Sequence, residues 1–203
     1  MKFGRLTAML VLALASTASA DVKSRLTSYE TEARALASNM PQPNQMSTQT
    51  GQRRLVDAQV DFTVGDYDAA SLALFDLVGK TSGPDKEVAT FYLAESLYQK
   101  GDRGAARAYF QALVASSNAG SRYFQPSLVR IVEIAIIEGD TAGGEAALAQ
   151  LNNVSAGVRS ASVPYVQGKW FFAQAQSTGD GTKLEQAIGL FAQVPKGSEY
   201  ELQ

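Results

Sequence analysis

Apolar residues recur at helical spacing along most of the chain, with one clear interruption near its start. Residues 38–50 include Pro41 and Pro43 and have no apolar period, which predicts a linker. The segment 21–37 before it has apolar residues three or four apart, the spacing that forms one stripe of an amphipathic helix: Leu26, Tyr29, Ala33 and Leu36. After the linker, residues 51–203 have helical patterning throughout.

The dipeptide Gly-Asp returns four times in residues 51–203, each time after one helical pattern and before the next. Its copies lie 36, 38 and 40 residues apart, at Gly65-Asp66, Gly101-Asp102, Gly139-Asp140 and Gly179-Asp180. Glycine supplies the left-handed conformation that ends a helix, and aspartate accepts hydrogen bonds from the free N–H groups that open the following one. Each copy is therefore predicted to be a helix hairpin, and four in register define an internal repeat.

Around these turns the sequence resembles the tetratricopeptide repeat family. The unit of that family, about 34 residues long, has a small residue in its first helix, Gly-Asp-aromatic at the turn, and Ala and Phe in its second helix. The second copy matches with Ala94, Gly101-Asp102, Ala106 and Phe110. The first copy matches with Ala58, Gly65-Asp66-Tyr67 and Ala70, and its aromatic residue, Phe75, comes one place late. The resemblance covers residues 51 to 200 and implies an all-α fold, an α-solenoid of about four tetratricopeptide-like hairpins.

The later copies depart from this pattern. The third has Val132 where a small residue is expected and Gly144 where the facing alanine would stand, which predicts a large-for-small exchange across one helix contact. In the fourth copy, Gly181-Thr182-Lys183 looks like an insertion, and the aromatic run Trp170-Phe171-Phe172 is predicted to be core. Residues from Ser198 onward read as the opening of another helix. Whether the natural chain continues past Gln203 stays open.

The resemblance also implies a concave groove lined by the first helix of each hairpin. Its expected partner-binding residues, carried over by register, are Gln59, Phe62, Phe91, Glu95, Tyr98, Glu133 and Lys169. These residues mix apolar, polar and charged side chains, a combination that suits an extended peptide or a partner helix.

The N-terminal residues 1–20 have the pattern of a cleaved signal peptide. Lys2 and Arg5 precede an apolar run, and small residues end at Ala20, where we expect cleavage. The apolar run is much shorter than the roughly 20 residues that span a bilayer, which argues against the alternative of a retained membrane anchor. The expected location of the mature chain is the bacterial periplasm.

Composition restricts the chemistry of the chain. It has no cysteine and no histidine, and therefore no thiolate, no imidazole and neither of the commonest transition-metal ligands. With 18 basic and 20 acidic residues the net charge is −2, which gives no electrostatic reason to bind nucleic acid. We therefore expect a protein that is not an enzyme and uses no cofactor or metal.

The expected function is a protein-protein interaction scaffold or adaptor in an envelope assembly, such as motility, secretion or outer-membrane machinery, with other envelope proteins as partners. Two alternatives stay open. The chain could be the helical-repeat part of a larger enzyme or receptor, or it could bind glycans or peptidoglycan through Trp170 and Tyr98.

Overall fold

The computed structural model of the chain describes residue 31, residues 48–117 and residues 120–201. The chain divides into two units, Met1–Met46 and Ser47–Gln203, and the helices described below belong to the second. The signal peptide predicted for residues 1–20, the helix predicted for residues 21–37 apart from Thr31, and most of the predicted linker lie outside the described residues.

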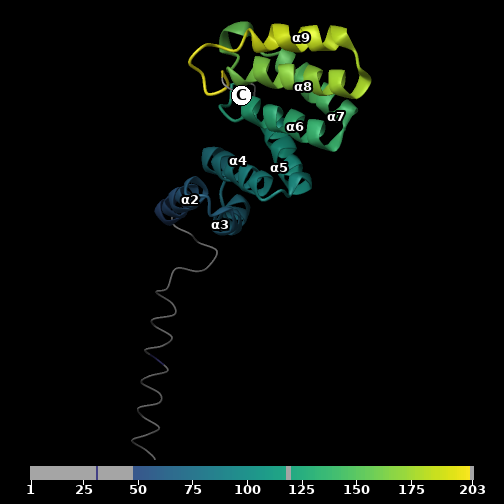
Figure 1. Cartoon of the computed structure of the whole chain (residues 1–203). Helices are drawn as coiled ribbons and strands as arrows, with labels where there is room; N and C mark the ends of the chain where they lie inside the picture. The colour runs from purple at the N-terminus through teal and green to yellow at the C-terminus, as the bar shows by residue number, and fades with distance from the viewer. Residues whose placement is uncertain (1–30, 32–47, 118–119, 202–203) are drawn as a thin grey trace, which may run out of the picture. The chain divides into compact units, whose positions relative to one another are not determined.

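The described residues of Ser47–Gln203 form four successive helix hairpins (Figure 1). Each hairpin consists of a first and a second helix: α2 (Thr48–Thr63) and α3 (Tyr67–Lys80), α4 (Gly83–Gln99) and α5 (Arg103–Ser116), α6 (Phe124–Glu138) and α7 (Thr141–Asn152), and α8 (Ser162–Thr178) and α9 (Gly181–Phe191). A short 3₁₀ helix, Ala156–Val158, lies between the last two hairpins. The predicted all-α solenoid of four hairpins is confirmed for these residues, and its first helix begins at Thr48, before the expected start at Gly51.

The four Gly-Asp turns have the geometry that the sequence predicts. Their glycines have positive φ angles of 85°, 83°, 69° and 71°, in the left-handed region that side chains disfavour. Each aspartate is an N-cap whose carboxylate accepts a backbone N–H of the next helix at 2.9 to 3.2 Å, from Ala69, Ala105, Gly143 and Thr182. These local bonds end one helix and start the next, which fixes where each hairpin folds back.

Small residues in the second helices let neighbouring helices approach closely. Ala70 and Ala106, four residues after the cap aspartate, and Ala147 and Ala187, seven residues after it, are all buried. Between hairpins, α3 packs on α4 and α5 packs on α6, and a continuous apolar core extends from Phe110 through Val132 to Trp170. Burial of these faces is the main favourable contribution to folding.

Gly144 of the third hairpin leaves room for a residue of the fourth, while its predicted exchange with Val132 stays a prediction. A Cβ atom on Gly144 would lie 2.0 Å from Trp170 Cζ3 and 2.1 Å from its Cη2, so the space beside Gly144 belongs to Trp170 of α8. Residues Gly181-Thr182-Lys183, predicted to be an insertion, form the first turn of α9, which begins directly after its cap Asp180. The buried Ala187 accordingly lies seven residues after the cap, against four for Ala106.

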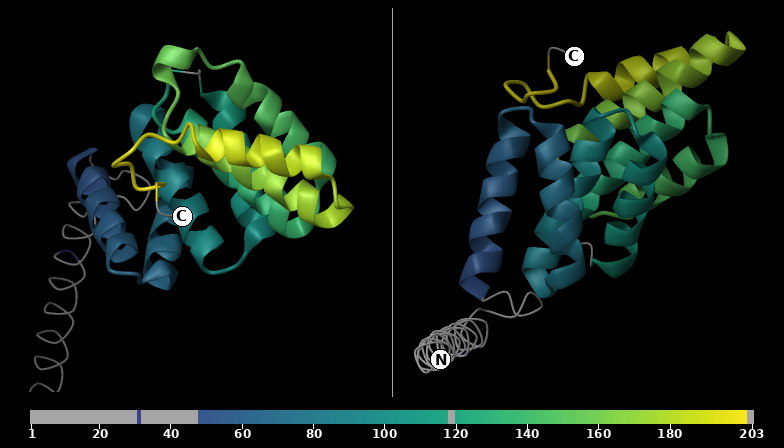
Figure 2. Two further views of the ribbon diagram at one scale, coloured as in Figure 1. Left: turned by 45° about the horizontal axis from the view of Figure 1, so that its top comes forward. Right: turned by 90° about the horizontal axis from the view of Figure 1, so that it is seen from below.

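The junctions along the stack are not equivalent. Among the first helices, α2 packs on α4 and α6 packs on α8, whereas α4 and α6 approach each other much less closely (Figure 2). Aromatic rings occupy that junction: Phe91 of α4 lies 4.7 Å from Tyr123 and 6.0 Å from Phe110 between ring centroids. The wider junction leaves room for a groove on the face that the first helices share.

The chain after α9 returns toward that face instead of opening another helix. Residues 195–201 form consecutive turns, with Ser198 N–H donating to Pro195 O at 3.2 Å and Glu201 N–H donating to Ser198 O at 3.1 Å. The predicted helix is therefore wrong for residues 198–201. Gly197, with a φ of 79°, directs this segment back along the stack.

Candidate functional site

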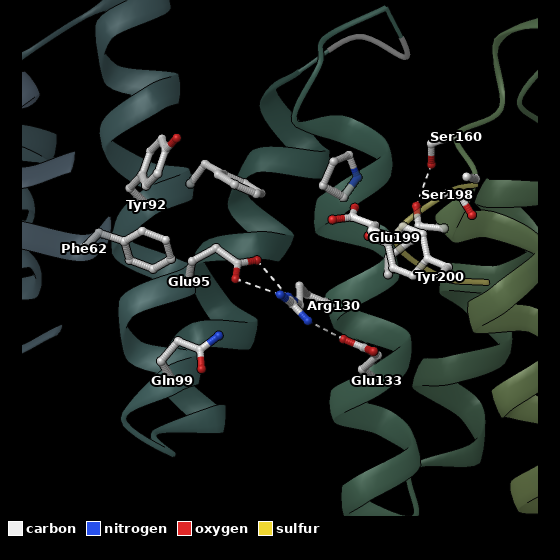
Figure 3. Close-up of a pocket in the computed structure, with 15 residues that line it drawn as sticks. Phe62, Tyr92, Glu95, Gln99, Arg130, Glu133, Ser160, Ser198, Glu199 and Tyr200 are labelled. Carbon is white, nitrogen blue, oxygen red and sulfur yellow. Dashed lines mark hydrogen bonds and ion pairs between the residues drawn. The ribbon is translucent and has the colours of Figure 1, made fainter. Parts of the chain in front are cut away.

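A groove of about 750 Å³ opens between α4 and α6 (Figure 3). Every helical residue in its wall belongs to the first helix of a hairpin, as the sequence predicts for the concave face. The helical residues of the wall are Phe62 of α2, Phe91, Tyr92, Glu95 and Gln99 of α4, Pro126, Val129, Arg130 and Glu133 of α6, and Ser162 of α8. Ser160 and Ala161 before α8 and residues 198–200 complete the wall.

Aromatic rings form one side of the groove and hold one another in place. The ring of Tyr92 lies 5.3 Å from Phe62 and 5.8 Å from Phe91, in edge-to-face arrangements. Such pairs contribute about 0.5–1.5 kcal/mol beyond the area they bury. Because each ring is fixed by its neighbours, this side of the groove is ordered before any partner arrives.

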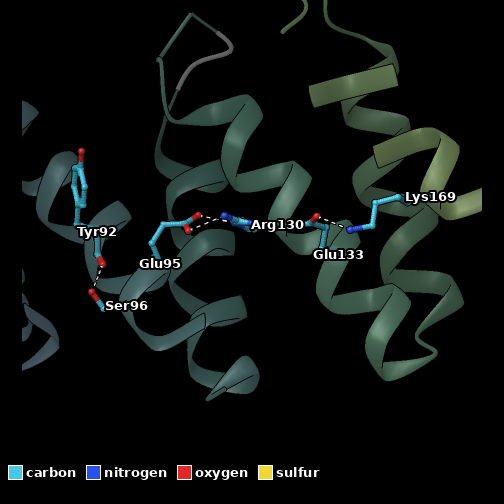
Figure 4. A network of polar contacts seen from close by, with 6 residues as sticks. All are labelled: Tyr92, Glu95, Ser96, Arg130, Glu133 and Lys169. Carbon is cyan, nitrogen blue, oxygen red and sulfur yellow. Dashed lines mark hydrogen bonds and ion pairs between the residues drawn. The ribbon is translucent and has the colours of Figure 1, made fainter. Parts of the chain in front are cut away.

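A chain of ion pairs crosses the groove floor (Figure 4). Arg130 of α6 donates to Glu95 of α4 through two nitrogens, Nε at 2.8 Å and Nη2 at 3.0 Å, and through Nη1 to Glu133 at 2.7 Å. Lys169 of α8 donates to the other oxygen of Glu133 at 2.9 Å. The two glutamates are only 6% and 8% exposed, so their charges depend on these partners. The network ties together α4, α6 and α8.

Two tyrosines lie against the cations of this network. The ring centroid of Tyr98 is 4.7 Å from Arg130 Cζ, and that of Tyr165 is 5.3 Å from Lys169 Nζ. Burial raises the pKa of the Tyr98 hydroxyl, and the negative charge of Glu133 raises it further. Burial acts to lower the pKa of Arg130, but its hydrogen bonds and charge interactions with the glutamates outweigh burial and raise it.

Lys169 follows the same balance as Arg130. Burial acts to lower the pKa of the Lys169 ammonium group, and the hydrogen bond to Glu133 together with its charge raises it above the ordinary value. Both cations therefore stay protonated at neutral pH. The groove floor therefore contains Arg130 and the network beside it contains Lys169, two protonated cations that each donate to a glutamate.

The structure brings together most of the residues predicted for the groove. Phe62, Phe91, Glu95 and Glu133 line it. Lys169 belongs to the ion-pair network, and Tyr98 lies against Arg130 of that network. Gln59 does not line the groove. That these residues bind a partner stays a prediction.

Sequence reasoning missed Arg130, Tyr92 and residues 198–200. Arg130 had a signal in the sequence, because it stands three residues before Glu133 in an otherwise largely apolar helix, where a charge needs a partner. Residues 198–200 had none, because they reach the groove only through the path of the chain after α9.

Trp170, a candidate for glycan binding together with Tyr98, is mostly buried. Its side chain is 5% exposed and belongs to the hydrophobic core beside Gly144, which leaves little of the indole for a sugar ring to stack on. Core was the predicted position for this aromatic run, which is confirmed for Trp170. Phe172 in the same run is 41% exposed.

Within the described ranges, no group of three or more acidic, histidine or cysteine residues is placed to hold a metal ion. No described helix combines the length and apolar character that crossing a membrane requires.

Fold and groove together define a class of protein, a helical-repeat solenoid with an aromatic and ion-paired groove on the face of its first helices. Comparison with protein-family models, with curated proteins and with solved structures finds no match for this chain.

Proposed function

We propose that this chain is a non-catalytic scaffold or adaptor of the tetratricopeptide type, which binds a segment of another protein in the groove between α4 and α6. The signal-peptide pattern that ends at Ala20 supports a periplasmic location, where the partners are components of an envelope assembly such as motility, secretion or outer-membrane machinery. The helical stack supplies a long surface, and the groove supplies its specific part.

The observation that carries the proposal is the construction of the groove. Its volume of about 750 Å³ lies in the range of ligand sites and accepts several side chains of a peptide. Phe62, Phe91 and Tyr92 offer apolar surface that is already ordered, so binding costs little side-chain entropy. Large aromatic anchors of this kind dominate the energetics of protein interfaces.

The ion pairs determine what kind of partner suits the groove. Glu95, Arg130, Glu133 and Lys169 neutralise one another, so the floor offers no unpaired charge from this set to a ligand. Affinity then comes mainly from apolar side chains inserted beside the rings, with few orienting hydrogen bonds. We expect binding that changes little between low and physiological salt, because long-range charge attraction contributes little.

Site-specific photo-cross-linking in living cells tests the proposal. A photoreactive phenylalanine analogue is placed at Gln99, which is exposed and lines the groove, or at Arg103, which is exposed on α5 of the same hairpin and does not line it. The expected result is a discrete adduct from position 99 that position 103 does not give. The adduct should weaken when Phe62→Ala removes one ring of the wall.

Identical adducts from both positions, or none from either while the protein is exported and folded, would contradict binding in the groove. Circular dichroism of the purified variants shows whether each has kept its helices.

A further inference from the structure

The segment that follows α9 occupies part of the groove. Residues 198–200 line it, and the ring of Tyr200 lies 5.2 Å from the ring of Tyr165 on α8. The ring of Tyr165 lies 6.1 Å from that of Phe191 in α9 and beside Lys169, so Tyr200 completes an aromatic cluster on α8 and α9. Burial raises the pKa of the Tyr200 hydroxyl, with a further contribution from Glu199, as expected for a phenol withdrawn from water.

The segment is held by side chains, and its backbone bonds close within it. Ser198 donates to Pro195, Glu201 donates to Ser198, and the N–H of Gly197 donates to the carboxylate of Glu201. Tyr200 supplies the ring contact between this turn and α8. Because residues 195–201 lie outside the helices, the turn can leave its site without unfolding any helix.

One atom of the segment fits the groove poorly. The side-chain oxygen of Ser198 is buried and has no hydrogen-bond partner. A buried hydroxyl without a partner destabilises the seated segment, and this cost disappears when the segment moves into water. This second observation, independent of the aromatic contact, shows that the groove holds the segment less well than a fully satisfied ligand.

We propose that the cleft beside Tyr165 is a receptor for an aromatic side chain of the partner, as in Tyr200, and that residues 195–201 occupy it in the free protein. The proposal rests on the function proposed above and names the chemistry of the partner segment. The partner segment replaces Tyr200 in the aromatic cluster and relieves the burial of Ser198. Binding is thereby conditional, because a ligand must displace the chain's own turn.

Tethering determines how strongly the segment competes. A short flexible connection gives an effective concentration of about 1 mM. For a peptide with an intrinsic Kd of about 100 μM, a competitor of the same chemistry then weakens the apparent affinity about tenfold. Replacing Tyr200 should therefore strengthen the apparent affinity of the peptide about tenfold.

The test is a fluorescence anisotropy titration with a labelled peptide that copies residues 194–203. The full chain is compared with its Tyr200→Ala variant, which empties the cleft and changes no helix. Lys196→Ala is the matched control, because Lys196 is exposed in the same segment and does not line the groove. A second peptide, with alanine in place of its tyrosine, measures the contribution of the ring.

We expect the peptide to bind the Tyr200→Ala chain about tenfold more tightly than the unchanged chain or the Lys196→Ala chain. The peptide without its tyrosine should bind none of them. Equal affinity for all three chains, or equal binding of both peptides, overturns the inference.

Absence of peptide binding to every chain also overturns the inference. If the cross-linker at Gln99 still captures a discrete protein, the scaffold function stands, and only the inference that the partner segment resembles residues 195–201 is wrong. If both experiments fail, the proposed function fails with it.

Discussion

Replacement of Gly144 by alanine tests how the third and fourth hairpins fit together. The added Cβ would lie 2.0 Å from Trp170 Cζ3, whereas carbon atoms pack best at about 3.5–4.0 Å. The indole would have to withdraw by about 1.5–2 Å, and it is 5% exposed with core residues around it. Overpacking of this kind costs about 1–3 kcal/mol.

An opposing effect has to be subtracted. Alanine favours the helix over glycine by about 1 kcal/mol, because it restricts the unfolded chain. The net free energy of unfolding is therefore expected to fall by up to about 2 kcal/mol. For a domain of this size, that lowers Tm by up to roughly 8 °C.

Thermal and urea unfolding followed by circular dichroism measure the change. Gly189→Ala is the matched control, because Gly189 lies inside α9 and a Cβ added there would meet no other atom within 4 Å. This variant should raise the free energy of unfolding by about 0.5–1 kcal/mol. Trp170 is the only tryptophan in the chain, so its fluorescence reports the disturbed contact directly. In a Trp170→Leu background, the effect of Gly144→Ala should disappear or change sign.

A gain in stability from Gly144→Ala in the unchanged background as large as that from Gly189→Ala would refute the reasoning. It would mean that α7 and α8 separate at no cost, and that Trp170 does not determine how closely the two hairpins approach.

Four further predictions concern the network, the caps, pH and export. Arg130→Met leaves two buried carboxylates without this cation and should lower the free energy of unfolding, measured by urea titration, by about 3 kcal/mol. Lys80→Met breaks an exposed ion pair and should lower it by less than about 1 kcal/mol. Asp102→Ala removes an N-cap and should cost about 1 kcal/mol, most of which Asp102→Asn restores. Hydrogen bonds from Ser117 and Ser121 hold the pKa of Glu87 below its ordinary value. The stability that Glu87 contributes is therefore present above the unfolded pKa and is lost as pH falls through the folded pKa. Glu87→Gln should reduce the difference in the free energy of unfolding between pH 7 and pH 3. Mass spectrometry of the protein from a periplasmic fraction should find a mature chain that begins directly after Ala20.

For the candidate site, the sequence predicted which residues face the groove but not how they pair with one another. Phe62, Phe91, Glu95 and Glu133 were placed in the groove by register alone, because a repeating hairpin sets which face of each first helix looks inward. Register does not predict which other side chains of the protein these residues contact. The pairing of Arg130 with a glutamate 35 residues earlier depends on how far α4 and α6 stand apart.

The amino-acid sequence by itself determined the hairpins. Each turn depends on a glycine with positive φ and on an aspartate that accepts an N–H two or three residues ahead. Because these interactions join residues close together in the chain, the four turns could be predicted without knowledge of the rest of the fold. Tertiary structure alone decided that Trp170 fills the space beside Gly144 and that Tyr200 lies against Tyr165. Those contacts depend on side-chain volumes and on the path of the chain between distant helices, which local pattern does not encode.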